Sequence, residues 1–317
     1  MIVHQPVLLD EVLALLVPPD EGGVMIDATL GQAGHAEAFL LKYPRLLFIG
    51  VDADPAVMET ARGRLVPFGA RVRFVNAWFG SFLSSFKAPE TAALVLMDLG
   101  ISRYHYDASG RGFSFDRDEP LDMRLDPSLP VSAADIVNTW GAADIAEILF
   151  TLGEERFARQ IASRIVRERE KASIDSAVRL AAVVAGAVPA ARQHRRLHPA
   201  TKTFQALRIA VNHELDQLEE ALAQVPRVLS PGGRIGVISF HSLEDRAVKR
   251  FFREKSRDCT CPPEWPICQC GGKADLRLVT AKAVVASDEE VSRNPASRSA
   301  RLRVAERPRE SGEGVGA

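Results

Sequence analysis

The chain has 317 residues, of which 46% are hydrophobic and 26% charged, and its formal net charge at pH 7 is −1. These values are typical of a globular protein with one large or two medium-sized domains, and they exclude a uniformly basic nucleic-acid binder. The sequence shows neither a run of ~18 apolar residues nor a basic leader before an apolar segment. We therefore expect no membrane partner and a cytoplasmic location.

The first elements of the chain predict a cofactor pocket. An apolar strand ends in Asp27, a loop with Gly31 and Gly34 follows, and a second apolar strand ends in Asp52. Glycines at a strand-to-helix turn let the backbone approach a ligand, and an acid roughly 20 positions later can hold ribose hydroxyls. Asp52 lies 18 positions after Gly34. This spacing predicts a pocket for an adenosine-containing cofactor.

The loop favours S-adenosylmethionine over a dinucleotide. Dinucleotide-binding loops have the pattern G-x-G-x-x-G, and here only Gly31-x-x-Gly34 is present. Asp27, four residues before Gly31, would repel a pyrophosphate but suits the ammonium and sulfonium groups of S-adenosylmethionine. An ordinary α/β turn without a ligand is the alternative interpretation.

Strands and helices then alternate, which predicts a parallel sheet covered on both faces. The expected elements are a helix over 55–65, a strand over 72–75, a helical piece over 79–86 and a strand over 93–98. The alternation stops between about 107 and 211, where helices are expected over 142–149, 154–169 and 176–187. The alternation resumes with a helix expected over 211–228, a strand over 234–240 and a helix over 243–253. An antiparallel edge is predicted from two late strands, over 276–279 and 299–304.

The expected fold is α/β, with a doubly wound, mostly parallel, Rossmann-like methyltransferase sheet and an inserted helical domain. The predicted boundaries are 1–106 for the first part of the methyltransferase core, 107–211 for an inserted helical substrate-binding domain, 212–306 for the second part of the core, and 307–317 for a disordered tail.

Two residues at strand ends are candidates for catalysis. Asp98 closes the fourth strand, where many enzymes that methylate exocyclic amines carry an aspartate, although the prolines that usually follow are absent. A structural acid at a strand end is the alternative for Asp98. His241 follows the fifth strand and is placed to touch a substrate. It equally fits a turn that leads into a helix capped by Ser242 and Asp245.

All four cysteines, Cys259, Cys261, Cys268 and Cys270, lie far in sequence from the cofactor loop. Methylation of a pyrimidine carbon usually needs a cysteine nucleophile, so their position favours direct transfer to nitrogen or oxygen. The cluster itself predicts either a structural zinc site or free thiols.

Two stretches are basic and free of acids. The segment 188–208 contains Arg192, Arg195, Arg196 and Lys202, and a second stretch spans 291–303. The first stretch is predicted to contact RNA phosphates, with a solvated surface as the alternative.

Several longer motifs resemble one family over residues 4 to about 306. They are His4-Gln-Pro-Val-Leu-Leu, Gly34-His35, Asp98-Leu-Gly-Ile-Ser, Arg111-Gly-Phe-Ser-Phe, Leu121-Asp-Met-Arg, Thr203-Phe-Gln-Ala-Leu-Arg-Ile, Ser239-Phe-His-Ser-Leu-Glu-Asp and Asn294-Pro-Ala-Ser-Arg-Ser-Ala. The chain resembles the MraW family, the bacterial small-subunit ribosomal RNA methyltransferases H.

The resemblance implies a 16S rRNA (cytosine-N4)-methyltransferase that uses S-adenosylmethionine on a cytidine of the decoding centre, at the P site. It implies cofactor contacts at Ala33, Gly34, His35, Asp52, Phe79, Asp98 and His105. The family has glycine at the position of Ala33 and glutamine at the position of His105. The implied partner is 16S rRNA or the small ribosomal subunit.

Alternatives remain open at this stage. A methyltransferase for a small molecule or a protein would use the helical insertion as a lid, and a non-catalytic RNA-binding assembly factor would keep only the cofactor fold. The sequence does not identify a general base, and it leaves the oligomeric state open, a homodimer included.

Overall fold

The computed structural model describes residues 6–87, 91–189, 198–259, 261, 265, 269 and 272–309. The chain folds into two compact units, one formed by residues 1–100 with 216–317 and the other by residues 101–215. The second unit interrupts the first in the sequence, as an insertion does. Its role in substrate binding stays a prediction.

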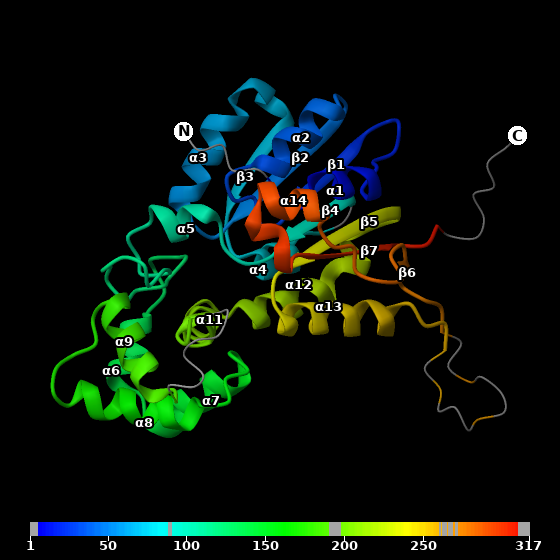
Figure 1. The fold of residues 1–317 in the computed structure, drawn as a ribbon. Helices are drawn as coiled ribbons and strands as arrows, with labels where there is room; N and C mark the ends of the chain where they lie inside the picture. The colour runs from blue at the N-terminus through cyan, green and yellow to red at the C-terminus, as the bar shows by residue number, and fades with distance from the viewer. Residues whose placement is uncertain are drawn as a thin grey trace, which may run out of the picture. The chain divides into compact units, whose positions relative to one another are not determined.

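The first unit is built on a seven-stranded sheet with the order β3-β2-β1-β4-β5-β7-β6 (Figure 1). The strands are β1 (Gly23–Asp27), β2 (Leu46–Asp52), β3 (Val72–Asn76), β4 (Ala92–Asp98), β5 (Leu229–Ser239), β6 (Arg277–Leu278) and β7 (Arg301–Glu306). Strands β1 to β5 run parallel, whereas β7 pairs antiparallel with β5 and β6 antiparallel with β7. The predicted fold class and its antiparallel edge are therefore confirmed.

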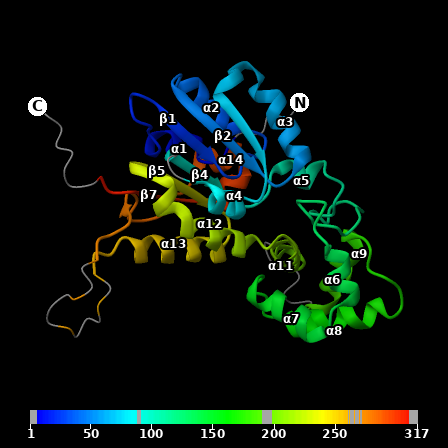
Figure 2. The same ribbon diagram turned by 180° about the vertical axis from the view of Figure 1, so that it is seen from behind.

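Helices cover both faces of this sheet because its parallel strands are apolar on both sides. One face packs against α1 (Leu9–Leu15), α2 (Gly34–Lys42) and α3 (Pro55–Leu65). The opposite face packs against α4 (Phe79–Ser85), α12 (Glu214–Val228) and α13 (Ser242–Lys255). Figure 1 and Figure 2 show α12 and α13 below the strands and α2 above them. Three further helical pieces are η1 (Val66–Arg71) and, between β6 and β7, α14 (Asp288–Arg293) and η2 (Pro295–Ser299). The sheet is thus doubly wound.

Local sequence signals explain why several boundaries were predictable. Helix α3 begins at Pro55, and the Asp54 side chain caps it by accepting a hydrogen bond from the Ala56 N–H at 2.9 Å. Strand β5 begins at Leu229, five residues before the predicted start at 234. Its pairing with β4 is irregular next to Ala92, because the Pro-Gly-Gly sequence there bends the strand without ending it.

The second unit is helical and has its own apolar core. Its helices are α5 (Arg103–Asp107), α6 (Ala133–Thr139), α7 (Ala142–Thr151), α8 (Ala158–Arg169), α9 (Ala177–Ala187) and α11 (Thr201–Asn212). Helix α8 begins four residues later than the predicted start at 154. The buried Glu155 side chain accepts a hydrogen bond from the Phe157 N–H at 2.8 Å, which orders a turn ahead of the helix.

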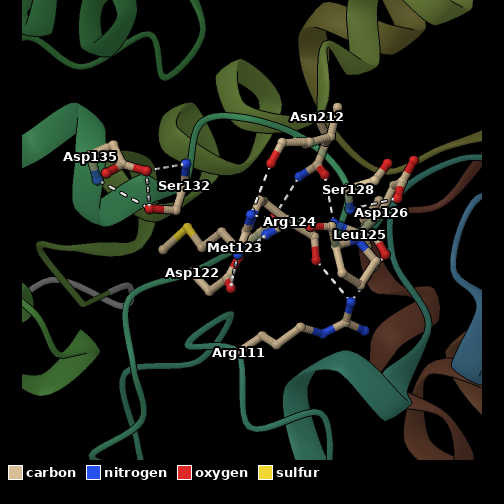
Figure 3. Close-up of polar contacts among 12 residues, drawn as sticks. Arg111, Asp122, Met123, Arg124, Leu125, Asp126, Ser128, Ser132, Asp135 and Asn212 are labelled. Atoms are coloured by element: carbon tan, nitrogen blue, oxygen red, sulfur yellow. Dashed lines mark hydrogen bonds and ion pairs between the residues drawn. The ribbon is translucent and has the colours of Figure 1, made fainter.

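The prediction of one continuous helix over 211–228 was wrong. The backbone of His213 adopts φ 51°, so α11 ends at Asn212 and α12 begins at Glu214. The Asn212 side chain accepts from the Leu125 N–H at 2.8 Å and donates to the Met123 carbonyl at 2.7 Å, as Figure 3 shows. Helix α11 therefore ends where its last side chain binds a distant turn, a contact that periodicity alone does not reveal.

Candidate active site

The topology of the sheet fixes where a ligand pocket can form. The chain passes from β1 to β2 and β3 on one side, and then crosses to β4 and β5 on the other side of β1. Loops leaving the carboxyl ends of β1 and β4 therefore diverge, and a crevice opens between them in open α/β sheets. Asp27, Asp52 and Asp98 are the last residues of β1, β2 and β4. The structure thus brings the three predicted strand-end acids to one edge.

Thr29 links the first and fourth strands at this edge. The Thr29 N–H donates to the Asp27 carboxylate at 3.2 Å, and the Thr29 hydroxyl oxygen accepts from the Asp98 N–H at 2.6 Å. Sequence analysis did not single out Thr29. Its position two residues after a strand-end acid, where a short hydroxyl side chain can bond the neighbouring backbone, is the signal that was available.

Asp52 holds two loops by their backbones. One of its carboxylate oxygens accepts from the Gly31 N–H at 2.8 Å and the other from the Asp54 N–H at 2.9 Å. A carboxylate oxygen can accept more than one hydrogen bond, so these two bonds do not by themselves exclude hydrogen bonds from ribose hydroxyls. The predicted role of Asp52 in cofactor binding stays a prediction, and the structure adds a role in shaping the loop.

The start of α2 explains the glycine of the loop. A Cβ atom at Gly34 would meet the Cγ atom of Pro6 at 2.5 Å, so only glycine fits without a shift of the N-terminal segment. Ala33 precedes it as the N-cap, is fully buried and adopts φ 62°. Its methyl group therefore occupies a backbone conformation that favours glycine, the residue expected at this position from the family resemblance.

Burial dominates the electrostatics of the pocket. Asp27 is 2% exposed, and burial, together with the nearby charge of Asp52, raises its pKa to about 7 against a hydrogen bond from Thr29 that lowers it. Burial, and then the charges of Asp27 and Glu244, raise the pKa of Asp98 well above its ordinary value. Carboxyl groups in such surroundings are held partly neutral, and a cation placed among them would favour their ionised forms.

His35 and Asp98, both predicted cofactor contacts, also face each other. The Nε2 atom of His35 lies 3.0 Å from the Val7 carbonyl oxygen, which can only accept, so Nε2 carries a proton. Its Nδ1 atom lies 3.7 Å from Asp98 Oδ2. The other carboxyl oxygen, Asp98 Oδ1, is buried and has no hydrogen-bond partner among the described residues. Buried polar atoms usually have a partner, so a hydrogen-bond donor or a cation of a ligand would fit next to this oxygen.

Phe79 lies close to the same edge. It is the first residue of α4 and packs, partly buried, against the core beneath the sheet. Two residues earlier, the Ala77 N–H donates to the Asp52 carbonyl oxygen at 3.1 Å. Phe79 therefore lies near Asp52 in the chain and in the fold, and its contact with an adenine stays a prediction.

His241 caps a helix, and the predicted cap at Ser242 and Asp245 was wrong. The Nδ1 atom of His241 accepts from the Glu244 N–H at 3.4 Å, and the Glu244 carboxylate accepts from the His241 N–H at 3.3 Å. This reciprocal pair is a capping box one residue earlier than predicted. Asp245 instead pairs with Arg303 at 2.7 Å. A catalytic role for His241 stays a prediction, and Glu244, which raises the pKa of Asp98, was missed.

Two further predicted site residues, His105 and Lys202, belong to the helical unit. His105 belongs to the helical unit, is 4% exposed and contacts the Phe113 ring edge-on, so its cofactor contact stays a prediction. Lys202 is exposed and donates to the Glu154 carbonyl oxygen at 2.8 Å. Arg192, Arg195, Arg196, Cys268 and Cys270 lie outside the described residues.

Two of the predicted zinc ligands are described. Cys259 is exposed, and Cys261 lies with its sulfur 3.4 Å from the Gln269 backbone nitrogen. The zinc hypothesis therefore stays a prediction. Among the described residues, no helix combines the length and the apolar character needed to cross a membrane.

Comparisons with known proteins agree with this geometry. The family model of the MraW methylase family matches residues 1–308. The chain is 54% identical over 305 residues to the ribosomal RNA small subunit methyltransferase H of Treponema denticola, covering 95% of this chain and 96% of that protein. It is 48% identical over 308 residues to the protein of the same name from Geobacter sulfurreducens, with 96% and 98% covered.

Solved structures are more distant. An rRNA methylase from Streptococcus thermophilus aligns with a TM-score of 0.41 at 10% identity, covering 95% of this chain and 94% of that one. The family is established by the sequence relatives, which span nearly the full length of both proteins. The chain belongs to the MraW methylase family.

Proposed function

We propose that this chain transfers a methyl group from S-adenosylmethionine to the small-subunit ribosomal RNA, and specifically to N4 of a cytidine in the decoding centre of 16S rRNA. The coarser part of the proposal is supported by relatives named ribosomal RNA small subunit methyltransferase H. The observation that carries it is the edge formed by the buried Asp27 of β1 and the partly buried Asp98 of β4, both with raised pKa values, together with the unpartnered Asp98 Oδ1.

The acids of this edge fit the charge of the cofactor. Asp27 and Asp98 would lie next to the cationic groups of the cofactor. The positive charge would favour the ionised forms of both carboxyls, which their surroundings in the protein disfavour. Asp52 would accept hydrogen bonds from the ribose, and Phe79 would cover the adenine. When bound, the cofactor supplies a methyl group on a sulfonium, which is ready for in-line displacement.

The residues of the chain then act on the nucleophile. The N4 lone pair of cytosine is shared with its ring, so a group that accepts one N4 hydrogen raises its reactivity. Asp98 is placed for this because its Oδ1 atom has no described partner and its N–H is fixed by Thr29. His35 faces the other oxygen at 3.7 Å and limits how the carboxyl can turn. Positioning of this kind contributes on the order of 7–11 kcal/mol in favourable systems.

RNA contact is assigned to the helical unit and its basic stretch. Arg192, Arg195, Arg196 and Lys202 would bind phosphates, which fix the orientation of an RNA without reading its bases. Lys202 is exposed, as such a contact requires, although its ammonium also donates to the Glu154 carbonyl.

A methyl-transfer assay tests the whole proposal. The purified chain is incubated with tritiated S-adenosylmethionine and, separately, with naked 16S rRNA, a partly assembled small subunit and the mature subunit. The RNA is then digested and the labelled nucleoside is identified by mass spectrometry. We expect N4-methylcytidine from at least one of the three substrates. Comparison of the three rates identifies the state of assembly that the protein recognises.

The same assay separates the alternatives. Label on another atom of the RNA would overturn the cytosine-N4 assignment and leave the coarser function in place. RNA that binds without receiving label would favour a non-catalytic assembly factor. Transfer of label to a protein or a small molecule in a cell extract, with no label on RNA, would favour a methyltransferase for that other substrate. The helical unit would then be interpreted as a lid.

The cysteine cluster supports a separate, smaller proposal of structural zinc held by Cys259, Cys261, Cys268 and Cys270. Protein purified without chelator should then contain about one equivalent of zinc. Metal analysis that finds none would favour free thiols.

A further inference from the structure

Helix α8 of the helical unit has two kinds of arginine. Arg164 and Arg169 contact the protein: Arg164 donates to the Gly186 carbonyl at 2.6 Å, and Arg169 donates to the carbonyls of Val137 and Trp140 at 2.9 and 2.7 Å. Arg159 and Arg167 are exposed, and so is Arg156, two residues before the helix. For these three arginines, no hydrogen bond or ion pair to another described residue is present.

The exposed arginines lie away from the buried side of the helix. Ala158, Ile161, Ala162 and Ile165 are buried in the core of the unit. At 3.6 residues per turn, Arg167 lies opposite the centre of that buried side and Arg159 lies about 110° from it, so the two arginines are about 80° apart around the axis. In both Figure 1 and Figure 2, α8 lies at the rim of the helical unit. We call Arg156, Arg159 and Arg167 the α8 arginine face.

The stability of α8 does not explain this face. The N-terminal end of a helix carries a partial positive charge, so Arg156 and Arg159 oppose the helix dipole there, at a cost of about 0.3–1 kcal/mol each. The first turn of α8 contains no acid that would compensate them. Glu168, the acid nearest Arg167 within the helix, pairs with Lys171 at 3.0 Å. The helix dipole therefore opposes Arg156 and Arg159 but favours Arg167, which lies in the last turn of α8 and, together with Lys171, helps to lower the pKa of Glu168. None of the three arginines has a hydrogen bond or an ion pair to another described residue.

We propose that the α8 arginine face binds the phosphate backbone of structured RNA. Arginine keeps its charge in any surroundings and presents a planar group that matches phosphate oxygens with two hydrogen bonds. Arg159 and Arg167 are about 12 Å apart along the helix axis. That length spans roughly three to four phosphates of one strand at the ~3.4 Å axial spacing of a duplex. The inference deepens the proposed function, on which it rests for its choice of RNA.

A charge-matched pair of variants tests the proposal. Arg159→Gln/Arg167→Gln removes two charges from α8, and glutamine has a helix propensity close to that of arginine. The control Lys249→Gln/Arg253→Gln removes two charges from exposed positions of α13 in the other unit. Equal thermal midpoints and equal affinities for S-adenosylmethionine establish that both variants are folded.

RNA affinity is then measured as a function of salt, on the RNA or subunit that wild-type protein binds best. Because each phosphate contact contributes ~0.7–0.9 to the slope of log affinity against log salt, the α8 variant should flatten that slope by roughly one and a half to two. Its KM for RNA should rise about tenfold or more, whereas kcat at saturating RNA should stay within about twofold. The control should keep the wild-type slope.

Three outcomes would overturn the proposal. An unchanged slope in the α8 variant would leave its arginines as a solvated surface. An equal loss in the α13 control would indicate a diffuse effect of net charge. Loss of binding to anionic lipid vesicles with RNA affinity unchanged would indicate a membrane surface as the partner. RNA binding is measured without methyl transfer, so a wild-type protein that binds RNA but transfers no methyl group refutes the proposed function and leaves this inference standing.

Discussion

Groups that carry charge of the same sign lie close together in two regions of this protein, and the two regions differ in whether those groups can become neutral. At the carboxyl edge of the sheet, burial and mutual repulsion raise the pKa values of Asp27 and Asp98, so these carboxyls can escape repulsion by holding a proton. On α8, Arg156, Arg159 and Arg167 stay in water and stay charged, since a guanidinium does not release its proton at ordinary pH.

The difference predicts two kinds of binding. A cation that enters the sheet edge should change the protonation of the acids, so its affinity should depend on pH. RNA that binds to the arginines of α8 should instead release the counterions condensed on its phosphates, so its affinity should depend on salt. Variants of Asp98, Asp27 and Asp52 test the binding predicted at the sheet edge, and the α8 variants test the binding predicted at α8.

Replacement of Asp98 by asparagine should have the largest effect. Asparagine keeps the shape of the side chain but places an amide where a carboxylate would accept the N4 hydrogen. We expect the rate of methyl transfer in a single turnover to fall by roughly 10²- to 10⁴-fold, the range of a positioned proton acceptor. Rapid-quench measurement with saturating cofactor and RNA gives this rate.

The matched control for Asp98 is Asp275→Asn, an exposed aspartate of the same unit that pairs with Lys255. It should transfer methyl groups at the wild-type rate. An Asp98→Asn variant within about threefold of wild type would show that Asp98 only shapes the strand end, and the acceptor of the proton would then be water or another group.

The second prediction concerns Asp27 and pH. Its pKa is about 7 in the folded protein and near 3.8 in the unfolded chain, so between these values the folded protein binds more protons. The free energy of unfolding should therefore fall as pH rises from about 4 to 7, by roughly 4 kcal/mol from this residue. Asp27→Asn imitates the protonated acid and should lose this dependence.

Urea unfolding of wild type and Asp27→Asn at pH 5 and pH 8 measures the effect. The variant should be the more stable protein at pH 8, and this advantage should be smaller by roughly 2–3 kcal/mol at pH 5, where folded wild type holds the proton on Asp27. The affinity of the wild type for S-adenosylmethionine should also strengthen between pH 6 and 8, because the cation favours ionised Asp27, and the variant should lack this trend. Parallel stability curves would show that Asp27 is already ionised in the folded protein.

Asp52 should have the third-largest effect. A hydrogen bond from a ribose hydroxyl to a charged carboxylate contributes ~1.5–3 kcal/mol, which corresponds to a dissociation constant about 10- to 100-fold higher when it is lost. Asp52→Asn is preferred to alanine because asparagine can still accept from the Gly31 or the Asp54 N–H. Isothermal titration with S-adenosylmethionine measures the change, and an unaltered constant would remove Asp52 from the site.

The carboxyl edge was predictable because it depends on local signals. Apolar runs that end in Asp27, Asp52 and Asp98 identify parallel strands, and parallel strands bring their carboxyl ends together. The contacts between distant segments were not predictable. The Thr29 hydroxyl reaches the Asp98 N–H over 69 positions, and Asn212 ends α11 by binding the backbone of Met123 and Leu125. The local sequence pattern does not indicate such distant partners.

The cap of α13 shows a subtler limit. Ser242 and Asp245 have the residue types and the spacing of a capping box, and the pair His241 and Glu244 is one position earlier. Serine is a more common N-cap than histidine, so residue propensity favours Ser242, which is the wrong N-cap position. The Glu244 carboxylate also accepts from the Phe240 N–H at the end of β5, and this additional bond to the preceding segment selects the observed frame.

The smallest effect should come from Ala33→Gly, where opposing terms nearly cancel. Relief of the left-handed conformation at φ 62° gains ~1–2 kcal/mol. Loss of a buried methyl group costs ~0.8 kcal/mol, and the greater freedom of glycine in the unfolded chain costs ~0.4–1 kcal/mol. The free energy of unfolding should therefore change by less than about 1 kcal/mol. Ala36→Gly, in the same helix and also fully buried, has no such strain to relieve and should cost ~1.5–2 kcal/mol. Urea unfolding of both variants makes the comparison, and an equal loss at the two positions would show that Ala33 bears no backbone strain.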